Sequence, residues 1–241
     1  MLTIGDHGEA VRELQQQLLT LGYTLGRAGA DGRFGPATAA AVQAFQQAHG
    51  LTADGVVGPM TEAALATALA PVPPAPLPLS LTVPNGLAEI RATFGDIQLV
   101  AGPDSSAPCY LRVLGDWAAS SLAFAHPEGI PSLSRIYCHR KLVAVIEAAF
   151  ADIAGAGLAA AVHSFDGCFC PRYKRRTQKQ LPSVHCWGIA LDLNAATNRQ
   201  GTKGDMSPQV VAVFRRHGFK WGGDWAGRYR DPMHFQYCTG Y

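Results

Sequence analysis

The chain has 241 residues, of which 48% are hydrophobic and 16% charged, so it can bury a core and is not of the disordered class. A net charge of +2 is too small to indicate nucleic acid binding, and no apolar run reaches the length of a membrane span. The first residues show no basic region followed by an apolar one, so no signal peptide is visible and we expect synthesis in the cytoplasm.

Residues 1–70 contain an internal repeat. The segment DGRFGPAT, which begins at Asp31, returns as DGVVGPMT at Asp54. In each copy Asp-Gly predicts a turn, and Gly-Pro places proline in the first turn of a helix, where its missing N–H breaks no hydrogen bond. We therefore expect helices that begin at Pro36 and Pro59. An earlier helix carries apolar residues at three- and four-residue steps: Val11, Leu14, Leu18 and Leu21.

This three-helix unit resembles the peptidoglycan-binding domain found beside many cell-wall hydrolases. The resemblance rests on LQQQLLTLGY, DGRFGPATAAAVQAFQQAHGL and DGVVGPMTEAAL, which occur in the expected order. It implies that peptidoglycan is the partner, and it does not indicate which side chains contact it. A generic three-helix docking or dimerisation module is the alternative, which the doubled motif disfavours.

Residues 71–84 are rich in proline, which predicts an extended, semi-rigid linker. A second domain is expected over residues 85–241. Apolar periodicity and turn residues predict its elements, which are helices at 87–94, 139–153 and 210–217 and a strand at 159–165.

All six cysteines lie in the second domain, and their pairing is not encoded in the sequence. They fit reduced thiols packed in the core, or disulfides formed after release into an oxidising compartment. A cysteine-ligated structural zinc site is a third alternative. The six are Cys109, Cys138, Cys168, Cys170, Cys186 and Cys238.

The side chains suited to chemistry lie in two short segments of the second domain. The first is SVHCWGIALD, residues 183–192, and the second is DPMH, residues 231–234. Together they offer two imidazoles, two carboxylates and a hydroxyl. Two histidines and one carboxylate form the ligand set of a catalytic zinc, which keeps its fourth position for water. One carboxylate then remains to take a proton from that water.

The local pattern places both segments on strands. From Gly188 onward, small or polar residues alternate with large apolar ones, and a similar alternation puts His234 and Gln236 on one face. His185 precedes Asp192 by an odd number of residues. The two reach one face only if a turn intervenes, for which Gly188 is suited.

The pattern Ser-x-His-x-x-Gly-x-Ala-x-Asp, followed by Asp-x-x-His, resembles the zinc D-Ala-D-Ala carboxypeptidases of the VanY type and the related L-Ala-D-Glu endopeptidases of phage lysins. The resemblance implies an α+β fold, in which the small three-helix domain precedes an antiparallel-sheet zinc peptidase domain like that of hedgehog proteins. It implies one Zn²⁺ per chain, with His185, Asp192 and His234 as ligands and Asp231 as the general base.

The resemblance also implies roles for residues around these ligands. Arg172 corresponds to an arginine that the family carries before its Ser-x-His motif, where it holds substrate and polarises the scissile carbonyl. Arg175 and Arg176 are alternatives, because Arg172 precedes a basic run. Ser183 is expected to hydrogen-bond substrate or to steady the loop before the first ligand. Trp221 is expected to line the substrate cleft.

A wall-binding unit beside a peptidase predicts a peptidoglycan stem peptide as the substrate. The absence of a visible signal peptide favours a phage endolysin, a bacteriolytic and antimicrobial protein that acts on the cell wall after release. We favour cleavage between L-Ala and D-Glu, with a D-Ala-D-Ala carboxypeptidase of wall remodelling as the alternative. We expect a monomer that binds neither nucleic acid nor membrane.

Three other interpretations compete with this one. The chain would be a non-catalytic, zinc-containing wall binder, as hedgehog domains keep zinc and act by binding. It would be a cysteine amidase that pairs Cys168 or Cys170 with His185 or His163. Or the motif would be two buried histidines and two surface aspartates. Within the peptidase interpretation, Asp224 is a second candidate for the base.

Overall fold

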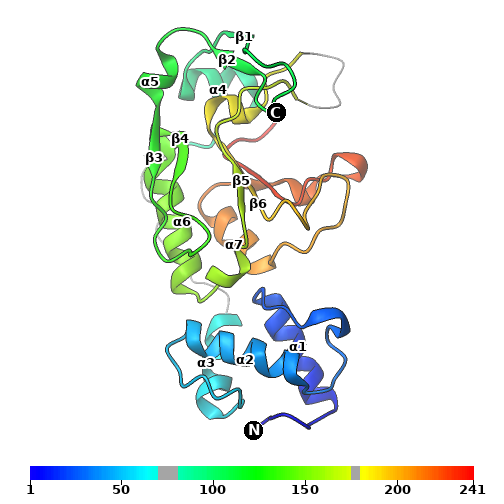
Figure 1. The fold of residues 1–241 in the computed structure, drawn as a ribbon. Helices are drawn as coiled ribbons and strands as arrows, with labels where there is room; N and C mark the ends of the chain where they lie inside the picture. Colours follow the sequence, from blue (N-terminus) through cyan, green and yellow to red (C-terminus); the bar gives the residue numbers. More distant parts are fainter. Residues whose placement is uncertain (70–80, 175–179) are drawn as a thin grey trace.

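The computed structural model describes residues 1–69, 81–174 and 180–241 (Figure 1). Helices dominate the N-terminal part, and short antiparallel strands with flanking helices form the rest, which confirms the predicted α+β class. Most of the predicted linker falls on residues 70–80, outside the described residues. Within the described ranges no helix is long and apolar enough to cross a membrane.

The N-terminal part contains three α-helices, α1 (Glu9–Thr20), α2 (Pro36–Ala48) and α3 (Pro59–Leu69), with a short turn η1 (Gly26–Ala28) after the first. Helices α2 and α3 begin at the two prolines of the repeat, as predicted. The apolar face predicted for the first helix is confirmed as buried: Val11, Leu14, Leu18 and Leu21.

Each copy of the repeat is built around a buried glutamine that the sequence analysis did not single out. The glutamine amide N–H groups donate to an aspartate carboxylate, a threonine hydroxyl and a backbone carbonyl, at 2.8–3.1 Å. The glutamine carbonyl accepts from the glycine N–H of the Asp-Gly turn. These bonds explain why Asp, Gly and Thr recur together. The two sets are Gln15, Asp31, Gly32 and Thr38, and Gln46, Asp54, Gly55 and Thr61.

The C-terminal part contains two antiparallel hairpins and an antiparallel four-stranded sheet of order β5-β6-β8-β7. One hairpin pairs β1 with β2 and the other β3 with β4. The strands are β1 (Leu99–Ala101), β2 (Leu111–Val113), β3 (Leu122–Ala125), β4 (Ile136–His139), β5 (Phe165–Gly167), β6 (Ala190–Leu193), β7 (Lys220–Trp221) and β8 (His234–Gln236). The helices and short turns are α4 (Gly86–Phe94), α5 (Trp117–Ser121), η2 (Arg140–Leu142), α6 (Val143–Gly155), η3 (Ala159–Ala161), η4 (Val184–Trp187), α7 (Pro208–Arg216), η5 (Gly222–Asp224) and η6 (Gly227–Tyr229).

Aromatic rings join the helices to the central sheet. Helix α6 contacts β3 and α7. The ring of Phe150 in α6 lies 5.4 Å from that of Phe214 in α7, which in turn lies 4.5 Å from Phe235 in β8. Because side chains alternate along a strand, this core turns the neighbouring residue of β8, His234, to the opposite face of the sheet.

The strand predicted at residues 159–165 is wrong. Ala159–Ala161 forms the 3₁₀ turn η3, and β5 begins only at the end of the predicted range. Alanine favours helical backbone. The N–H groups of His163 and Ser164 donate to Asn194 Oδ1, at 2.7 and 3.1 Å, in place of a neighbouring strand.

The helix predicted at residues 139–153 begins later, at Val143, because His139 ends strand β4. The Nδ1 atom of His139 accepts a hydrogen bond from the Lys141 N–H at 3.2 Å, which caps the intervening turn η2. The other two predicted helices are confirmed as α4 and α7.

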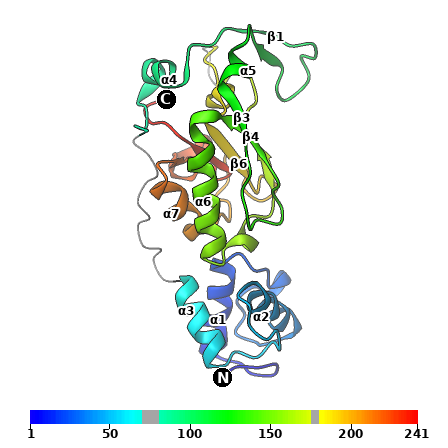
Figure 2. The ribbon, with the colours of Figure 1, turned by 90° about the vertical axis from the view of Figure 1, so that its left-hand side faces the viewer.

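The three-helix part lies against the end of the second part that carries the C-terminus of α6 (Figures 1 and 2). The Ser207 hydroxyl, directly before α7, donates to the Thr20 carbonyl at 2.9 Å. Gly157, which follows α6, faces the ring of His49 so closely that a Cβ atom on the glycine would overlap the ring. The contact therefore depends on the absence of a side chain at Gly157.

Candidate metal centre

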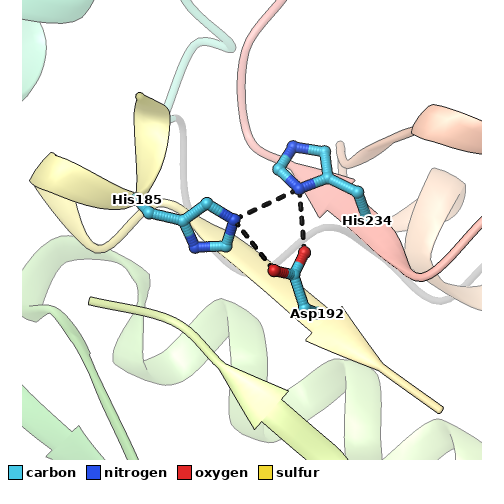
Figure 3. Close-up of side chains that lie close together, drawn as sticks. All are labelled: His185, Asp192 and His234. Atoms are coloured by element: carbon cyan, nitrogen blue, oxygen red, sulfur yellow. Dashed lines mark hydrogen bonds and ion pairs between the residues drawn. The ribbon is translucent and has the colours of Figure 1, made fainter. Parts of the chain in front are cut away.

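Three side chains meet on one face of the central sheet (Figure 3). Asp192 of β6 stands opposite His234 of β8 in the antiparallel register, so both side chains project to the same face. His185 reaches this face from the turn η4. That turn ends at Gly188, whose φ of 63° is left-handed, and a Cβ atom there would lie 2.9 Å from the His139 nitrogen. The turn predicted at Gly188 is confirmed.

The spacing of the three ligand atoms fits one zinc ion. His185 Nε2 lies 3.3 Å from Asp192 Oδ2 and 3.3 Å from His234 Nδ1, and His234 Nδ1 lies 2.9 Å from Asp192 Oδ1. All three residues are buried. Donors about 2.0–2.1 Å from a tetrahedral zinc lie about 3.3 Å from one another. Two imidazoles and one carboxylate at these separations suit that ion.

A backbone carbonyl orients the first imidazole. His185 Nδ1 lies 2.7 Å from the carbonyl oxygen of Cys168. A carbonyl only accepts, so Nδ1 carries the hydrogen and Nε2 presents its lone pair to the cluster. No sequence signal identifies this partner, because any residue type at position 168 supplies the same carbonyl.

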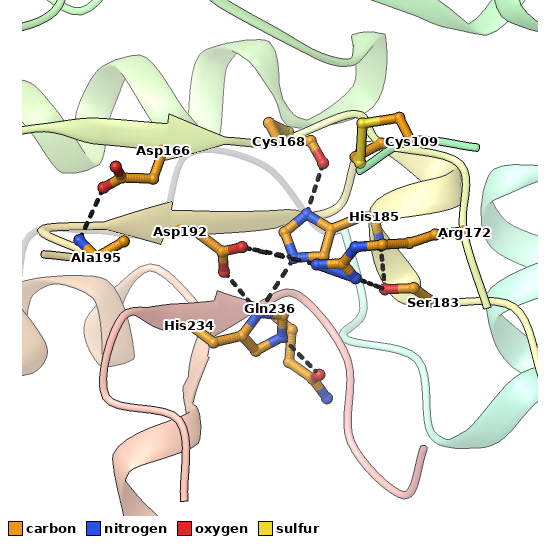
Figure 4. Close-up of polar contacts among 11 residues, drawn as sticks. Cys109, Asp166, Cys168, Arg172, Ser183, His185, Asp192, Ala195, His234 and Gln236 are labelled. Atoms are coloured by element: carbon orange, nitrogen blue, oxygen red, sulfur yellow. Dashed lines mark hydrogen bonds and ion pairs between the residues drawn. A yellow bond between two sulfur atoms is a disulfide. The ribbon is translucent and has the colours of Figure 1, made fainter. Parts of the chain in front are cut away.

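A glutamine orients the second imidazole. His234 Nε2 lies 3.1 Å from Gln236 Oε1, and the glutamine amide in turn donates to the Cys238 carbonyl at 3.3 Å. The oxygen of Gln236 therefore accepts from Nε2–H, and Nδ1 of His234 faces the cluster (Figure 4). The sequence placed Gln236 on the face of His234 and assigned it no role.

Charge and burial set the protonation of the cluster. Burial raises the pKa of Asp192, but the two adjacent imidazoles outweigh it and hold that pKa well below its usual range. Burial lowers the pKa of His185, which favours the neutral imidazole that ligates metals. Burial also disfavours charge on His234, but its bond to the Asp192 carboxylate outweighs this and raises the pKa of His234.

Arg172 and Ser183 lie beside the cluster, and their expected contacts with substrate stay predictions. The Ser183 hydroxyl accepts from Arg172 Nη1 at 3.1 Å and from the His185 N–H at 3.4 Å, so it steadies the loop before His185. Arg172 Nη2 lies 3.8 Å from Asp192 Oδ2 (Figure 4). The alternatives Arg175 and Arg176 lie outside the described residues.

The two candidate bases occupy different surroundings. Asp231 lies in the loop before β8, where its carbonyl accepts from the His234 N–H at 3.0 Å and its charge contributes to the raised pKa of His234. Asp224 is exposed, and both its oxygens accept from Arg215 Nη2 at 2.6–2.7 Å. This arrangement favours Asp231, whose role as the base stays a prediction.

A cavity of about 410 Å³ adjoins the cluster, and two of the residues that line it contact His234. The ring of Trp225 lies 5.4 Å from the His234 ring. Gln236 is the hydrogen-bond partner of His234. Trp221 also lines this cavity, but its indole N–H donates to the Pro232 carbonyl at 2.7 Å and so braces the loop before β8. Trp225 was not singled out from the sequence, although the same Trp-rich segment contains it.

The cysteines do not form a second reactive centre. Cys170 is joined to Cys109 in a disulfide, and burial raises the pKa of the Cys168 thiol well above its usual value. Because the thiolate is the nucleophile, the geometry disfavours the amidase interpretation. Both of the first two alternatives for the cysteines therefore occur: one pair forms a disulfide, and Cys138 and Cys186, like Cys168, are free thiols buried in the core. Across the described ranges, this cluster is the one group of three or more His, Cys, Asp or Glu side chains placed closely enough to hold a metal ion.

Two separate stretches of the chain match known families. Residues 7–65 match the family described as "Putative peptidoglycan binding domain", and residues 176–237 match the family described as "D-alanyl-D-alanine carboxypeptidase". The chain thus joins a peptidoglycan-binding domain to a VanY-like domain of the D-alanyl-D-alanine carboxypeptidase family. The second match includes the metal cluster and Asp231, whereas Arg172 precedes it. The predicted domain boundaries stay predictions.

Similarity to individual proteins is confined to short stretches. The chain is 53% identical over 60 residues to the "Zinc D-Ala-D-Ala carboxypeptidase" of Streptomyces albus G, which is 25% of this chain and 24% of that protein. It is 37% identical over 91 residues to the "Probable N-acetylmuramoyl-L-alanine amidase" of Bacillus licheniformis, which is 38% of this chain and 25% of that protein. The chain therefore spans only about a quarter of the length of these relatives.

Proposed function

We propose that the protein is a zinc-dependent peptidase that hydrolyses an amide bond in the stem peptide of peptidoglycan, with one zinc ion per chain. The observation that carries this proposal is the buried cluster of His185, Asp192 and His234, whose donor atoms have the spacing and orientation that zinc requires. The peptidoglycan-binding domain supports the substrate class, because tethering raises the concentration of the peptidase at the polymer.

The residues around the cluster suit amide hydrolysis. A zinc ion at this site supplies Lewis-acid chemistry, which lowers the pKa of water and polarises a carbonyl. The Asp231 carboxylate accepts a proton from the attacking water and returns it to the leaving amine. The Arg172 guanidinium, steadied by Ser183, donates to the oxyanion that develops on the scissile carbonyl. The cavity beside Trp225 receives the substrate.

We further infer that the bond is the one between L-Ala and D-Glu and that the protein is a monomeric, bacteriolytic phage endolysin. In this role it is made in the cytoplasm and acts on the wall after release. The pairing of Cys109 with Cys170 supports action in an oxidising compartment. A D-Ala-D-Ala carboxypeptidase is the second candidate, favoured by the name of the matched family and of the Streptomyces albus G relative.

Mass spectrometry of digested sacculi separates the two bonds. The endopeptidase creates a new L-Ala carboxyl terminus inside the stem peptide and leaves the peptide termini intact. The carboxypeptidase removes only the terminal D-Ala. Release of terminal D-Ala without internal cleavage would contradict the endolysin proposal and support the second candidate.

Metal analysis and lysis test the catalytic proposal itself. We expect about one zinc per chain, lost in His185→Ala, since a catalytic zinc has three protein ligands. The protein should clear a suspension of cell walls, stop when a chelator is added and resume when zinc returns. A protein that binds walls and zinc without cleaving either candidate bond would instead be the non-catalytic binder considered from the sequence.

A further inference from the structure

A second cavity, of about 570 Å³, lies on the peptidoglycan-binding domain at the first copy of the repeat. We call it the first-copy pocket. Its wall is formed by the N-terminal loop, the turn η1 and the start of α2. Residues that line it include His7, Ala28, Arg33, Phe34, Pro36 and Ala37.

The carboxylates of the first-copy pocket are already engaged within the domain. Asp6 accepts from the Thr3 N–H at 2.8 Å. Asp31 accepts from Gln15 and from the Arg33 N–H, each at 2.9 Å, and these hydrogen bonds lower its pKa. Both acidic groups therefore serve the fold of the repeat.

Two basic residues, Arg33 and His7, line the same pocket. Arg33 and His7 are exposed, and among the residues that the structure describes neither side chain has a hydrogen bond or an ion pair. A guanidinium has a planar fork of N–H donors that matches a carboxylate. The pocket thus offers exposed donors from Arg33 and His7, of which the Arg33 charge also acts on the nearby Asp31 carboxylate, beside small apolar groups at Ala28, Pro36 and Ala37.

The second copy of the repeat is a natural comparison, because it has the same backbone plan and different charges. Val56 occupies the position of Arg33, so the second copy has no cation there. Glu62 occupies the position of Ala39, near the start of α3, and its carboxylate lies 3.7 Å from the Met1 amine. The first copy alone therefore combines a positive group with an absence of acid on its helix.

We propose that the first-copy pocket binds the stem peptide of peptidoglycan through a peptide carboxylate held by Arg33, with the apolar wall against alanine methyl groups. A glycan ligand is disfavoured, because Phe34 is 2% exposed and no other aromatic side chain but that of His7 lines the pocket to pack on a sugar ring. This inference rests on the proposed function, since it names the part of the wall polymer that the binding domain recognises.

Sedimentation of the full-length protein with purified sacculi, in the presence of a chelator that stops cleavage, tests the proposal. Arg33→Val, which gives the first copy the residue of the second, should weaken binding by roughly tenfold or more, as expected for loss of a charged hydrogen bond. Arg33→Glu should weaken it further. The matched control is Arg27→Val, an exposed arginine of η1 that does not line the pocket and should bind like the parent protein. Equal thermal unfolding of all variants shows that they are folded.

Competition separates the two parts of the polymer. A soluble stem tripeptide should displace the protein from sacculi, whereas a chitooligosaccharide should not. Displacement by the sugar alone, or equal binding by the Arg33 and Arg27 variants, would overturn the inference. Hydrolysis of a soluble stem peptide by the parent protein is measured separately, so a failure of the proposed function is distinguishable from a failure of this pocket.

Discussion

Two residues that would not touch the metal decide which ring nitrogens face it. The Cys168 carbonyl and the Gln236 amide oxygen each accept the N–H of one imidazole. As a result His185 presents Nε2 and His234 presents Nδ1, although the two side chains come from elements of different kinds. A ligand set fixed in this way loses little conformational freedom when it binds an ion.

Replacement of Gln236 should weaken zinc binding without removing a ligand. Gln236→Leu leaves His234 without an acceptor for its Nε2–H, so we expect zinc affinity to fall by about 10- to 100-fold. Competition with a chromophoric chelator measures this. Gln236→Glu keeps an acceptor at the same place and should retain most of the affinity. Equal affinities for the parent and Gln236→Leu would show that the hydrogen bond does not orient the ring.

Replacement of Asp231 should separate chemistry from metal binding. Asp231→Asn cannot accept the proton, so we expect kcat on a soluble stem peptide to fall by about 10²- to 10⁴-fold while zinc content is unchanged. Asp224→Asn is the comparison, because that carboxylate lines the same cavity but is paired with Arg215. If Asp224→Asn abolished turnover and Asp231→Asn did not, the base would be assigned to the wrong aspartate.

At the scale of elements, His139 connects strand β4 to helix α4 through a neutral ring. Its Nε2 lies 3.2 Å from the Phe94 carbonyl, so Nε2 carries the hydrogen, and its Nδ1 accepts from the Lys141 N–H. Burial lowers the pKa of His139 to about 4. Protonation of Nδ1 would place its new N–H against the Lys141 N–H, so that two donors face each other. It would also put a positive charge on a buried ring.

Stability should therefore fall in acid. Below pH 6.5, the ordinary pKa of histidine, the unfolded chain binds a proton at position 139, whereas the folded chain does not until about pH 4. The free energy of unfolding should fall by up to about 3 kcal/mol as pH decreases across this window. Urea titrations measure it. His139→Gln, which does not titrate, should show a shallower fall, and parallel curves for the two proteins would exclude His139 as the cause.

Elements with a local signal were predictable from the sequence. Gly-Pro fixed the starts of α2 and α3, and the period-two pattern around Asp192 and His234 predicted strands that present both side chains to one face. The strand prediction failed at the alanine run of residues 159–161. Its apolar side chains suggested a strand, but the preference of alanine for helical backbone gave a 3₁₀ turn. The partner of Cys109 and the carbonyl partner of His185 depend on tertiary contacts, for which one sequence has no pattern.

At the scale of the whole molecule, the peptidoglycan-binding domain is seated on the peptidase domain near the C-terminal end of α6 (Figure 2). The Ser207 hydroxyl bonds to the Thr20 carbonyl, and Gly157 accommodates the His49 ring. If the protein hydrolyses peptidoglycan as proposed, a seated binding domain would hold the catalytic domain at a set orientation to the polymer, so the contact should affect turnover of sacculi more than turnover of small peptides.

A methyl group at Gly157 tests this coupling, because it would overlap the His49 ring, so that either this side chain or the two domains must shift. Gly157→Ala should increase the radius of gyration in small-angle X-ray scattering and lower the rate on sacculi several-fold, with the rate on a soluble stem peptide unchanged. Gly115→Ala is the matched control: its φ of 77° carries a similar left-handed strain of about 1–2 kcal/mol, but nothing lies within 4 Å of the added carbon. If both variants kept the parent's radius and its rate on sacculi, the seating of the domains would not govern attack on the wall.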